Sequence, residues 1–305
     1  MTDTGATPAV SVVVCTVNRY DHLIACLRTI LANTGDDFEV LVVDQNDVET
    51  HRRAIAEVGP DPRLRWILNS VRGLSHARNR ALEHARAPLI AFTDDDCRVP
   101  TDWVASIQGA FQADPEVSLL FGAAVLRPED RSKGWGAEFE PVTPLQLQNG
   151  LPDGRTVWGI GANMIIHRRV FERVGGFDVM LGAGAPFRAG EEIDLTIRSL
   201  CEGFRVLQTP AVSLIHLGVR EGREAGRLMR SYGLGLGATL GKHVRLGTPG
   251  AAKLLAHWMA IQGGRSVRNA LAGQRHPGFG LMASVMLGAC KAYVRSLDRV
   301  RAVYC

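Results

Sequence analysis

The apolar residues in the first third of the chain form short runs that are separated by amphipathic stretches. Runs rich in β-branched or aromatic residues predict buried strands at Val10–Val17, Phe38–Val43, Leu64–Leu68 and Leu89–Thr93. Between them, apolar residues that recur every three or four positions predict a helix after Asp21 and helices over Val48–Val58 and Leu74–Ala85. This alternation predicts an α/β fold with a doubly wound, mostly parallel sheet and right-handed crossovers.

Polar residues follow three of these strands. Thr16–Asn18 end the first strand, Asp44 ends the second, and the carboxylates Asp94, Asp95 and Asp96 end the fourth. In doubly wound sheets the carboxyl ends of parallel strands share one edge, where ligands bind. Three adjacent carboxylates also need water or a cation to offset their repulsion. Each cluster alone is compatible with a turn or helix cap, but together they predict a site of nucleotide size.

The sequence lacks the glycine-rich loops that bind phosphates in many nucleotide-binding proteins. The turn after the first strand has no GxGxxG motif, and no GxxxxGK[ST] occurs anywhere. A bound phosphate would therefore need a divalent cation at Asp94–Asp96, with help from Arg78 or Arg80.

The middle of the chain continues the strand and helix pattern. We expect, in order, a helix over Pro100–Ala113, a strand over Val117–Leu126, a loop-rich insertion over Arg127–Gly154, a strand over Val157–Ile166 and a short helix over Arg168–Val174. A helix then opens with Glu191-Glu192-Ile193-Asp194, where acidic residues complement the helix dipole. A final strand pair, Phe204–Gln208 and Ala211–Ile215, ends at His216.

The charge is distributed unevenly along the chain. The whole protein has a net charge of +4, but Arg220–Cys305 holds 14 Lys and Arg against 3 Asp and Glu. Further apolar helices are expected over Ala251–Ile261 and Leu281–Val294. We therefore expect one domain over residues 1–218 and a basic helical C-terminal extension over residues 219–305. The extension can pack on the core or bind an anionic membrane surface. No nucleic-acid module accompanies it, so we expect no nucleic-acid partner.

The cysteines and the termini bear on the cellular location. The six cysteines are scattered without a CxxC pair, which is typical of a reducing compartment. Met1–Ala9 lacks the pattern of a signal peptide, and no apolar run reaches the roughly 18–20 residues of a spanning helix. We expect a cytoplasmic protein that can associate with the inner face of the cell membrane.

Seven stretches, in this order along the chain, resemble the family 2 glycosyltransferases of the GT-A fold. They are 11–19 (SVVVCTVNR), 42–44 (VVD), 73–80 (GLSHARNR), 92–96 (FTDDD), 161–163 (GAN), 174–178 (VGGFD) and 190–195 (GEEIDL). The resemblance covers Val10–His216. It implies an inverting transferase of EC 2.4 type that moves a sugar from a nucleoside-diphosphate sugar to an acceptor hydroxyl. We expect a UDP-sugar donor and a glycan or lipid-linked acceptor, in cell-envelope or exopolysaccharide synthesis.

The resemblance also implies a metal site. Asp94–Asp96 match the DxD motif of the family, in which Asp96 would ligate Mn²⁺ or Mg²⁺ together with Asp94. Asp94 or Asp95 would approach the ribose of the donor. His216 matches a third metal ligand. Which of the three aspartates has which role stays open at this point.

Other residues match donor-binding and catalytic positions of the family. Thr16 and Asn18 would line the donor pocket, Asp44 would contact the base or ribose, and Arg78 would approach the base or phosphates. The catalytic base would come from the pair that opens a helix, Glu191 and Glu192. Glu192 stands where the family usually has Asp, so Glu192 is the first candidate and Glu191 the second.

Two other functions are compatible with parts of the sequence. A nucleotidyltransferase that makes nucleotide sugars would share the α/β core and the metal, but it would need the missing glycine-rich phosphate loop. An inactive transferase that serves as a membrane-surface binding module would not need the intact Asp94–Asp96 triplet or the Glu191-Glu192 pair.

Overall fold

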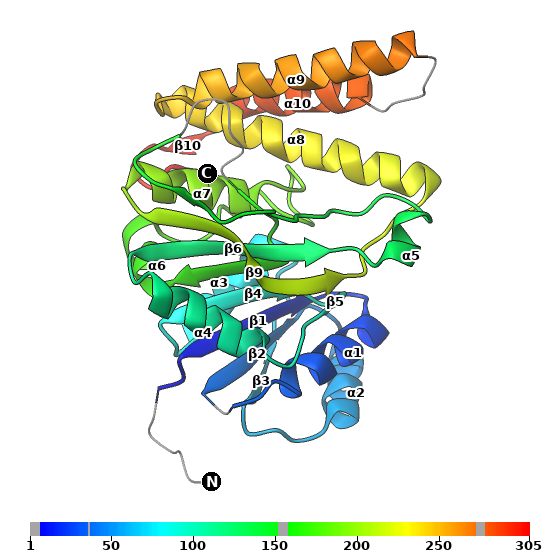
Figure 1. Cartoon of the computed structure of the whole chain (residues 1–305), viewed down its shortest axis with the longest axis vertical. Coiled ribbons are helices and arrows are strands. Elements are labelled where there is room, and N and C mark those ends of the chain that lie inside the picture. Colours follow the sequence, from blue (N-terminus) through cyan, green and yellow to red (C-terminus); the bar gives the residue numbers. More distant parts are fainter. Residues whose placement is uncertain (1–6, 36, 152–157, 273–277) are drawn as a thin grey trace.

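One mixed sheet forms the centre of the protein (Figure 1). The structure is a computed structural model that describes residues 7–35, 37–151, 158–272 and 278–305. Among the described residues the sheet has nine strands in the order β3-β2-β1-β4-β8-β6-β9-β5, with β7 also paired to β9. The strands are β1 (Val10–Thr16), β2 (Phe38–Asp44), β3 (Leu64–Leu68), β4 (Leu89–Asp94), β5 (Cys97–Arg98), β6 (Val117–Val125), β7 (Leu145–Leu147), β8 (Asn163–His167) and β9 (Arg205–His216).

The first four strands form the parallel part of the sheet. Strand β1 pairs with β2 and β4, and β2 pairs with β3, all in parallel. The register places Thr16 opposite Asp44 and Cys15 opposite Asp94, so the polar strand ends share one edge as the sequence predicts. Strands β6 and β9 are also parallel, whereas β8, β5 and β7 run antiparallel to their neighbours.

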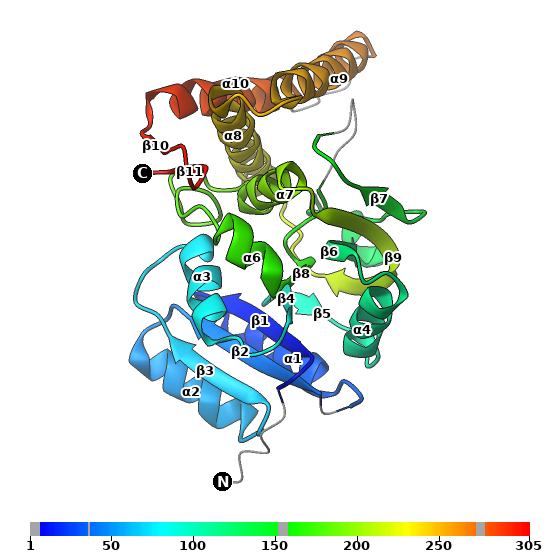
Figure 2. The same cartoon turned by 90° about the vertical axis from the view of Figure 1, so that its left-hand side faces the viewer.

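Helices cover both faces of the sheet (Figure 2). These helices are α1 (Tyr20–Leu31), α2 (Val48–Val58), α3 (Leu74–His84), α4 (Trp103–Ala113), α6 (Arg168–Val174) and α7 (Glu191–Cys201). Because side chains alternate along a strand, β1 contributes Val12 and Val14 to the core under α1, α2 and α4. It contributes Val13 to the second core, under α3, α6 and α7. The predicted doubly wound arrangement is confirmed.

Two predicted elements differ from the structure. Only the second half of the predicted strand Val157–Ile166 is a strand, and Val157 lies outside the described residues. The chain instead turns before Asn163, where Gly159 and Gly161 allow a close approach: a Cβ on Gly161 would lie 2.7 Å from Arg78 Nη2. The predicted final pair is one long strand, β9, with an irregular register near Gly122 and Ala123 of β6.

The predicted loop-rich insertion contains two short elements. They are α5 (Pro128–Arg131) and the edge strand β7, and the last residues of the insertion, 152–154, lie outside the described residues. Residues 135 and 139 of the insertion also make isolated bridges to Arg220 and Ala124, so this segment contacts both strand β6 and the residues just before α8.

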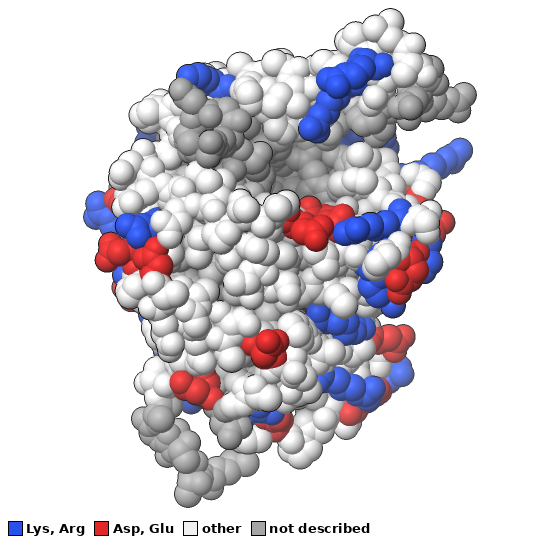
Figure 3. All heavy atoms as spheres, viewed as in Figure 1, with Lys and Arg blue, Asp and Glu red and all other residues white. Residues whose placement is uncertain are grey.

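Three helices form a layer at one end of the molecule: α8 (Gly222–Leu246), α9 (Ala251–Leu271) and α10 (Gly278–Val294). A small hairpin, β10 (Leu297–Asp298) and β11 (Val303–Tyr304), follows them. On the face shown in Figure 3, this layer carries basic side chains among uncharged ones, while acidic and basic side chains are interspersed over the body. None of the helices in the described ranges is both long and apolar enough to cross a bilayer.

Candidate active site

A cleft of about 790 Å³ opens at the carboxyl edge of the sheet. It brings together most of the residues that the sequence analysis predicts for donor binding, metal binding and catalysis. The predicted residues that line it are Thr16, Asn18, Arg78, Asp94, Asp95, Asp96, Glu191, Glu192 and His216. Helix α8 closes one side with Arg227, Ser231 and Tyr232, so the C-terminal layer contributes to this cleft.

Hydrogen bonds hold the aspartate triplet at the base of the cleft. Thr16 Oγ1 donates to Asp95 Oδ2 at 2.7 Å. Arg19 Nη1 donates to Asp95 Oδ1 at 3.0 Å and to Asp96 Oδ2 at 2.7 Å. Burial raises the pKa of Asp95 to about 6, although Arg19 and Thr16 oppose that rise. Arg19 therefore offsets part of the repulsion among the three carboxylates.

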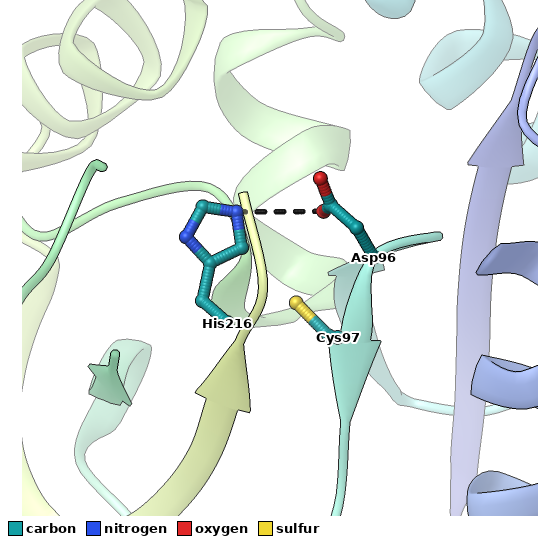
Figure 4. A group of neighbouring side chains, drawn as sticks. All are labelled: Asp96, Cys97 and His216. Carbon is teal, nitrogen blue, oxygen red and sulfur yellow. Dashed lines mark ion pairs between the residues drawn. The ribbon is translucent and has the colours of Figure 1, made fainter. Parts of the chain in front are cut away.

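Asp96 and His216 form the best candidate metal site (Figure 4). His216 Nδ1 lies 2.9 Å from the Ala137 carbonyl oxygen, which can only accept, so Nδ1 carries the proton. The other ring nitrogen, Nε2, lies 3.4 Å from Asp96 Oδ1. Oδ1 is buried and has no hydrogen-bond partner within the described ranges. An unsatisfied carboxylate oxygen that faces an imidazole nitrogen fits a divalent cation.

Cys97 is the third member of this cluster. Its Sγ and the ligand atoms of Asp96 and His216 all lie within 4.8 Å of one another. Burial raises the pKa of the Cys97 thiol well above its ordinary value, which keeps the sulfur protonated. Mn²⁺ and Mg²⁺ prefer oxygen and imidazole ligands to sulfur. The chemistry of these groups therefore favours Asp96 and His216 as ligands.

Asp94 occupies the more open position of the triplet. Its side chain is 34% exposed, and its Oδ1 lies 3.7 Å from Arg78 Nη2. Burial of the cleft floor and the charge of Asp96 raise the pKa of Asp94, with Arg78 acting against them. The position is compatible with contact to a bound ligand in the cleft.

The two glutamates at the start of α7 have different surroundings. Gly190 caps the helix with φ of 94°, which lets the chain turn sharply into the cleft. Arg78 is buried beneath Glu191, and its Nη1 donates to Glu191 Oε1 at 2.9 Å. Glu192 is less buried than Glu191, and in the described part of the chain no salt bridge reaches it. Burial, and next the charge of Glu191, raise the pKa of Glu192 well above its ordinary value.

Asp44 lies behind the cleft. Its carboxylate is fully buried, accepts hydrogen bonds from the backbone and side-chain nitrogens of Asn46 and lies 2.9 Å from His51 Nδ1. The neighbouring Gln45 lines the cleft in its place. Arg80, the alternative phosphate contact, points outward and pairs with Glu83.

A buried charge network joins α7, the helix that opens with Glu191 and Glu192, to α8. Asp194 accepts hydrogen bonds from Arg198 Nε at 2.9 Å and lies 2.6 Å from Lys242 Nζ and 2.9 Å from His243 Nε2. Lys242 Nζ also contacts Asp178 Oδ2 at 2.7 Å. The Asp178, Asp194 and Lys242 side chains are all fully buried. The sequence pattern gave no sign of this network, because Lys242 lies 64 residues from Asp178.

These features define a class of enzyme: a GT-A-type glycosyltransferase, with a carboxylate triplet at the sheet edge and a carboxylate pair on the facing helix. Among solved structures, the chain is similar to the mannosyltransferase PcManGT from Pyrobaculum calidifontis in complex with GDP-Man and Mn²⁺. That likeness has a TM-score of 0.63 and 21% identity, and covers 95% of this chain and 88% of that one. The GT-A-like fold is thereby confirmed.

The chain belongs to the glycosyl transferase family 2, whose sequence profile matches residues 11–175. It is 30% identical over 227 residues to the O-antigen biosynthesis protein RfbC of Myxococcus xanthus, a match that covers 69% of this chain and 17% of that protein. It is 26% identical over 192 residues to the glucosyl-dolichyl phosphate glucuronosyltransferase of Haloferax volcanii, covering 57% of each. The matched region thus spans less than two thirds of either relative.

Proposed function

We propose that this glycosyltransferase moves a sugar, with inversion, from a nucleoside-diphosphate sugar to a hydroxyl group of a glycan or lipid-linked acceptor. The observation that carries the proposal is the position of Glu192 in the same cleft as Asp94–Asp96. A direct displacement needs a base on the acceptor side and groups that bind the departing diphosphate on the other. The cleft offers both.

The residues have the following proposed roles. The Glu192 carboxylate takes the proton of the acceptor hydroxyl as the acceptor oxygen attacks the anomeric carbon. Its raised pKa makes it a stronger base than an ordinary carboxylate. Arg78 holds Glu191 in an ion pair and thereby fixes the start of α7. Thr16 and Arg19 orient Asp95, and Asn18 lines the donor side of the cleft.

Asp96 and His216 would hold a divalent cation, Mn²⁺ or Mg²⁺, with Asp94 beside it. When bound, the cation neutralises negative charge on the diphosphate. The unsatisfied Asp96 Oδ1 and the His216 Nε2 that faces it support this assignment. Mn²⁺ is also the ion in the complex of the structurally similar mannosyltransferase.

The C-terminal layer supports a location at an anionic membrane surface. Helix α10 exposes Phe279, Leu287 and Tyr293 at 50% or more. It belongs to Arg220–Cys305, which holds 14 Lys and Arg in total, although α10 itself contains only Lys291. Apolar side chains beside basic ones are typical of surfaces that bind anionic bilayers. We therefore place the enzyme on the cytoplasmic side of a membrane, where lipid-linked acceptors occur.

A donor-turnover assay tests the proposed function. The full chain is incubated with UDP-, GDP- and dTDP-sugars and Mn²⁺, with and without EDTA, and the released nucleotide is identified. We expect metal-dependent release of nucleoside diphosphate from one class of donor. Release of pyrophosphate would instead indicate a nucleotidyltransferase, and absence of turnover with every donor would indicate a binding module.

A further inference from the structure

A second cavity, of about 620 Å³, adjoins the donor cleft. The two share the lining residues Ala137, Ile160, Ala189, Glu192 and Tyr232. Glu192, the candidate base, therefore lies at the junction between the cavity and the cleft that holds Asp94–Asp96. A molecule in the second cavity could therefore contact the proposed base while a donor occupies the cleft.

The walls of this second cavity are mainly apolar. Three of the five tryptophans of the chain line it, namely Trp135, Trp158 and Trp258. Other apolar residues come from the segment directly after β6 and from α7, α8 and α10; these are Leu126, Ile193, Met229, Leu236 and Leu281. Its charged residues other than Glu192 are Arg131 and Glu138, and these two form a salt bridge with each other. Each of these two charged side chains therefore already has a partner of opposite charge.

This composition favours an apolar occupant. A sugar chain presents hydroxyl groups at nearly every carbon, and each buried hydroxyl without a hydrogen-bond partner is unfavourable. A site for a long sugar chain would therefore need many more polar side chains than this cavity provides. An alkyl or isoprenoid group needs none, and each methylene it buries strengthens binding by about three- to fourfold.

We propose that the second cavity binds a long alkyl or isoprenoid group of the acceptor, with the reactive hydroxyl of that acceptor at Glu192. The inference rests on the proposed function and specifies its acceptor as amphiphilic. In the reaction, the acceptor O–H proton passes to the Glu192 carboxylate and a new bond forms between the acceptor oxygen and the anomeric carbon. The bond from that carbon to the diphosphate breaks, and its electron pair leaves with the nucleoside diphosphate.

The position of the cavity agrees with such an acceptor. Met229 and Leu236 come from α8, Trp258 from α9 and Leu281 from α10, so the C-terminal layer supplies a large part of the wall. The outer side of the same layer exposes apolar residues, among them Phe279 and Leu287 of α10. An acceptor anchored in a bilayer by its apolar chain would meet this layer first.

Contact quenching of tryptophan fluorescence tests the proposal directly. The probe is 11-bromo-1-undecanol, because bromine quenches indole on contact, and unbrominated undecanol serves as the blank. We expect saturable quenching of the wild-type protein, and weaker binding by about three- to fourfold for each methylene removed from the probe. Absence of saturable quenching, or affinity that does not depend on chain length, would overturn the proposal.

Two variants of one helix distinguish this cavity from the outer surface. Leu281→Arg places a charge on the cavity wall and should abolish the saturable quenching. Phe279→Arg makes the same charge change on the exposed side of α10, two residues away, and should leave the quenching unchanged. Circular dichroism melting of both variants checks the fold. Equal quenching in Leu281→Arg and wild type would show that the probe binds elsewhere, and the proposal would then fail.

The donor-turnover assay runs in parallel, so that the two conclusions can fail separately. Donor turnover without alkyl quenching would remove the amphiphilic acceptor and leave the proposed transferase function intact. Quenching without turnover of any donor would remove the proposed function, and the cavity would then be only an alkyl-binding site.

Discussion

At the scale of single residues, Asp96 has a buried carboxylate oxygen that lacks a hydrogen-bond partner among the described residues. Asp96→Ala should abolish Mn²⁺-dependent binding of UDP or GDP, because the proposed cation would lose a direct ligand. The loss should exceed the roughly 10- to 100-fold that changes in the second coordination shell cause. Calorimetric titration with Mn²⁺ present measures it. Cys97→Ala is the matched control and should retain binding, whereas equal affinity in Asp96→Ala and wild type would refute the metal assignment.

In the proposed mechanism, Glu192 gives the reaction a characteristic pH dependence. The deprotonated carboxylate would act as the base and its pKa is raised, so activity should increase as the pH rises through a value above the ordinary carboxyl range. Glu192→Gln should lower kcat by about 10²- to 10⁴-fold and remove this rising limb, while donor affinity stays unchanged. Steady-state kinetics at a series of pH values measure both. A Glu192→Gln enzyme with near-normal kcat would place the base elsewhere.

Most of the cleft could be predicted from single residues, because parallel strands carry their carboxyl ends to one edge. That rule brings Thr16 within hydrogen-bond distance of Asp95 across 79 positions of sequence. The role of Arg19 could not be predicted, since its reach to Asp95 and Asp96 depends on how the chain turns after β1. The surroundings of Asp44 could not be predicted either, because they depend on Asn46 and His51 in the following loop and helix.

At the scale of secondary-structure elements, Lys242 joins α8 to α7. Lys242→Met should lower the free energy of unfolding at pH 7 by about 3–5 kcal/mol, since Asp178 and Asp194 would stay buried without their shared cation. Burial alone would raise the pKa of Asp194, but Lys242, Arg198 and His243 outweigh it and hold that pKa below its ordinary value. Stability from this network is therefore present above about pH 4 and is lost as the pH falls below it.

Chemical denaturation at several pH values measures this effect. The difference between wild type and Lys242→Met should shrink in acid, where the carboxylates become protonated. Lys291→Met removes an exposed lysine of α10 and should change stability by no more than about 0.5 kcal/mol. A Lys242→Met protein as stable as this control would show that the ion pairs contribute no net stability.

The contact between α8 and α10 depends on glycines that allow the backbones to meet. A Cβ on Gly237 would lie 1.9 Å from the Val285 carbonyl oxygen, and one on Gly288 would lie 2.1 Å from that of Leu234. Gly237→Ala should therefore lower the free energy of unfolding by about 1–3 kcal/mol through overpacking. Gly264→Ala in α9 meets open space and should stabilise by about 0.5–1 kcal/mol. Thermal melts that ranked the two variants in the opposite order would contradict this packing.

Elements with strong periodicity were predicted well from the sequence. Helix α2 and strand β3 begin and end where the pattern placed them, because Asp47 caps the helix and Gly59, with φ of 78°, ends it. Strand β5 was missed, since two residues cannot establish a period. Strand β8 was predicted too long because Gly159–Ala162 are apolar although they are irregular and turn at Gly161 and Ala162. The packing of Tyr232–Gly241, a part of α8, against α10 could not be predicted from the sequence, because it depends on the tertiary structure.

At the scale of the whole molecule, α9 and α10 lie at the end opposite to α2 (Figure 2), and both helices expose apolar residues. A double variant, Leu287→Asp and Tyr293→Asp, should reduce binding to vesicles of anionic phospholipid by at least about tenfold, through lost burial and added repulsion. Ile55→Asp on α2 is the control and should bind as wild type does. Co-sedimentation with vesicles measures binding. If the wild-type chain does not sediment with them, the membrane location is wrong.

The buried network also fixes an order of events during synthesis. Asp178 accepts a hydrogen bond from the backbone nitrogen of Tyr304, which lies 126 residues further along the chain. Asp194 forms its ion pair with Lys242, which also comes later in the chain. Contacts of such high sequence separation form late, because the intervening chain must first be made and ordered. The helix that presents Glu191 and Glu192 therefore reaches its final environment only after the C-terminal hairpin has been translated. We therefore expect a nascent chain that ends before Tyr304 to lack the final environment of α7, and with it the fixed position of Glu192, the proposed base.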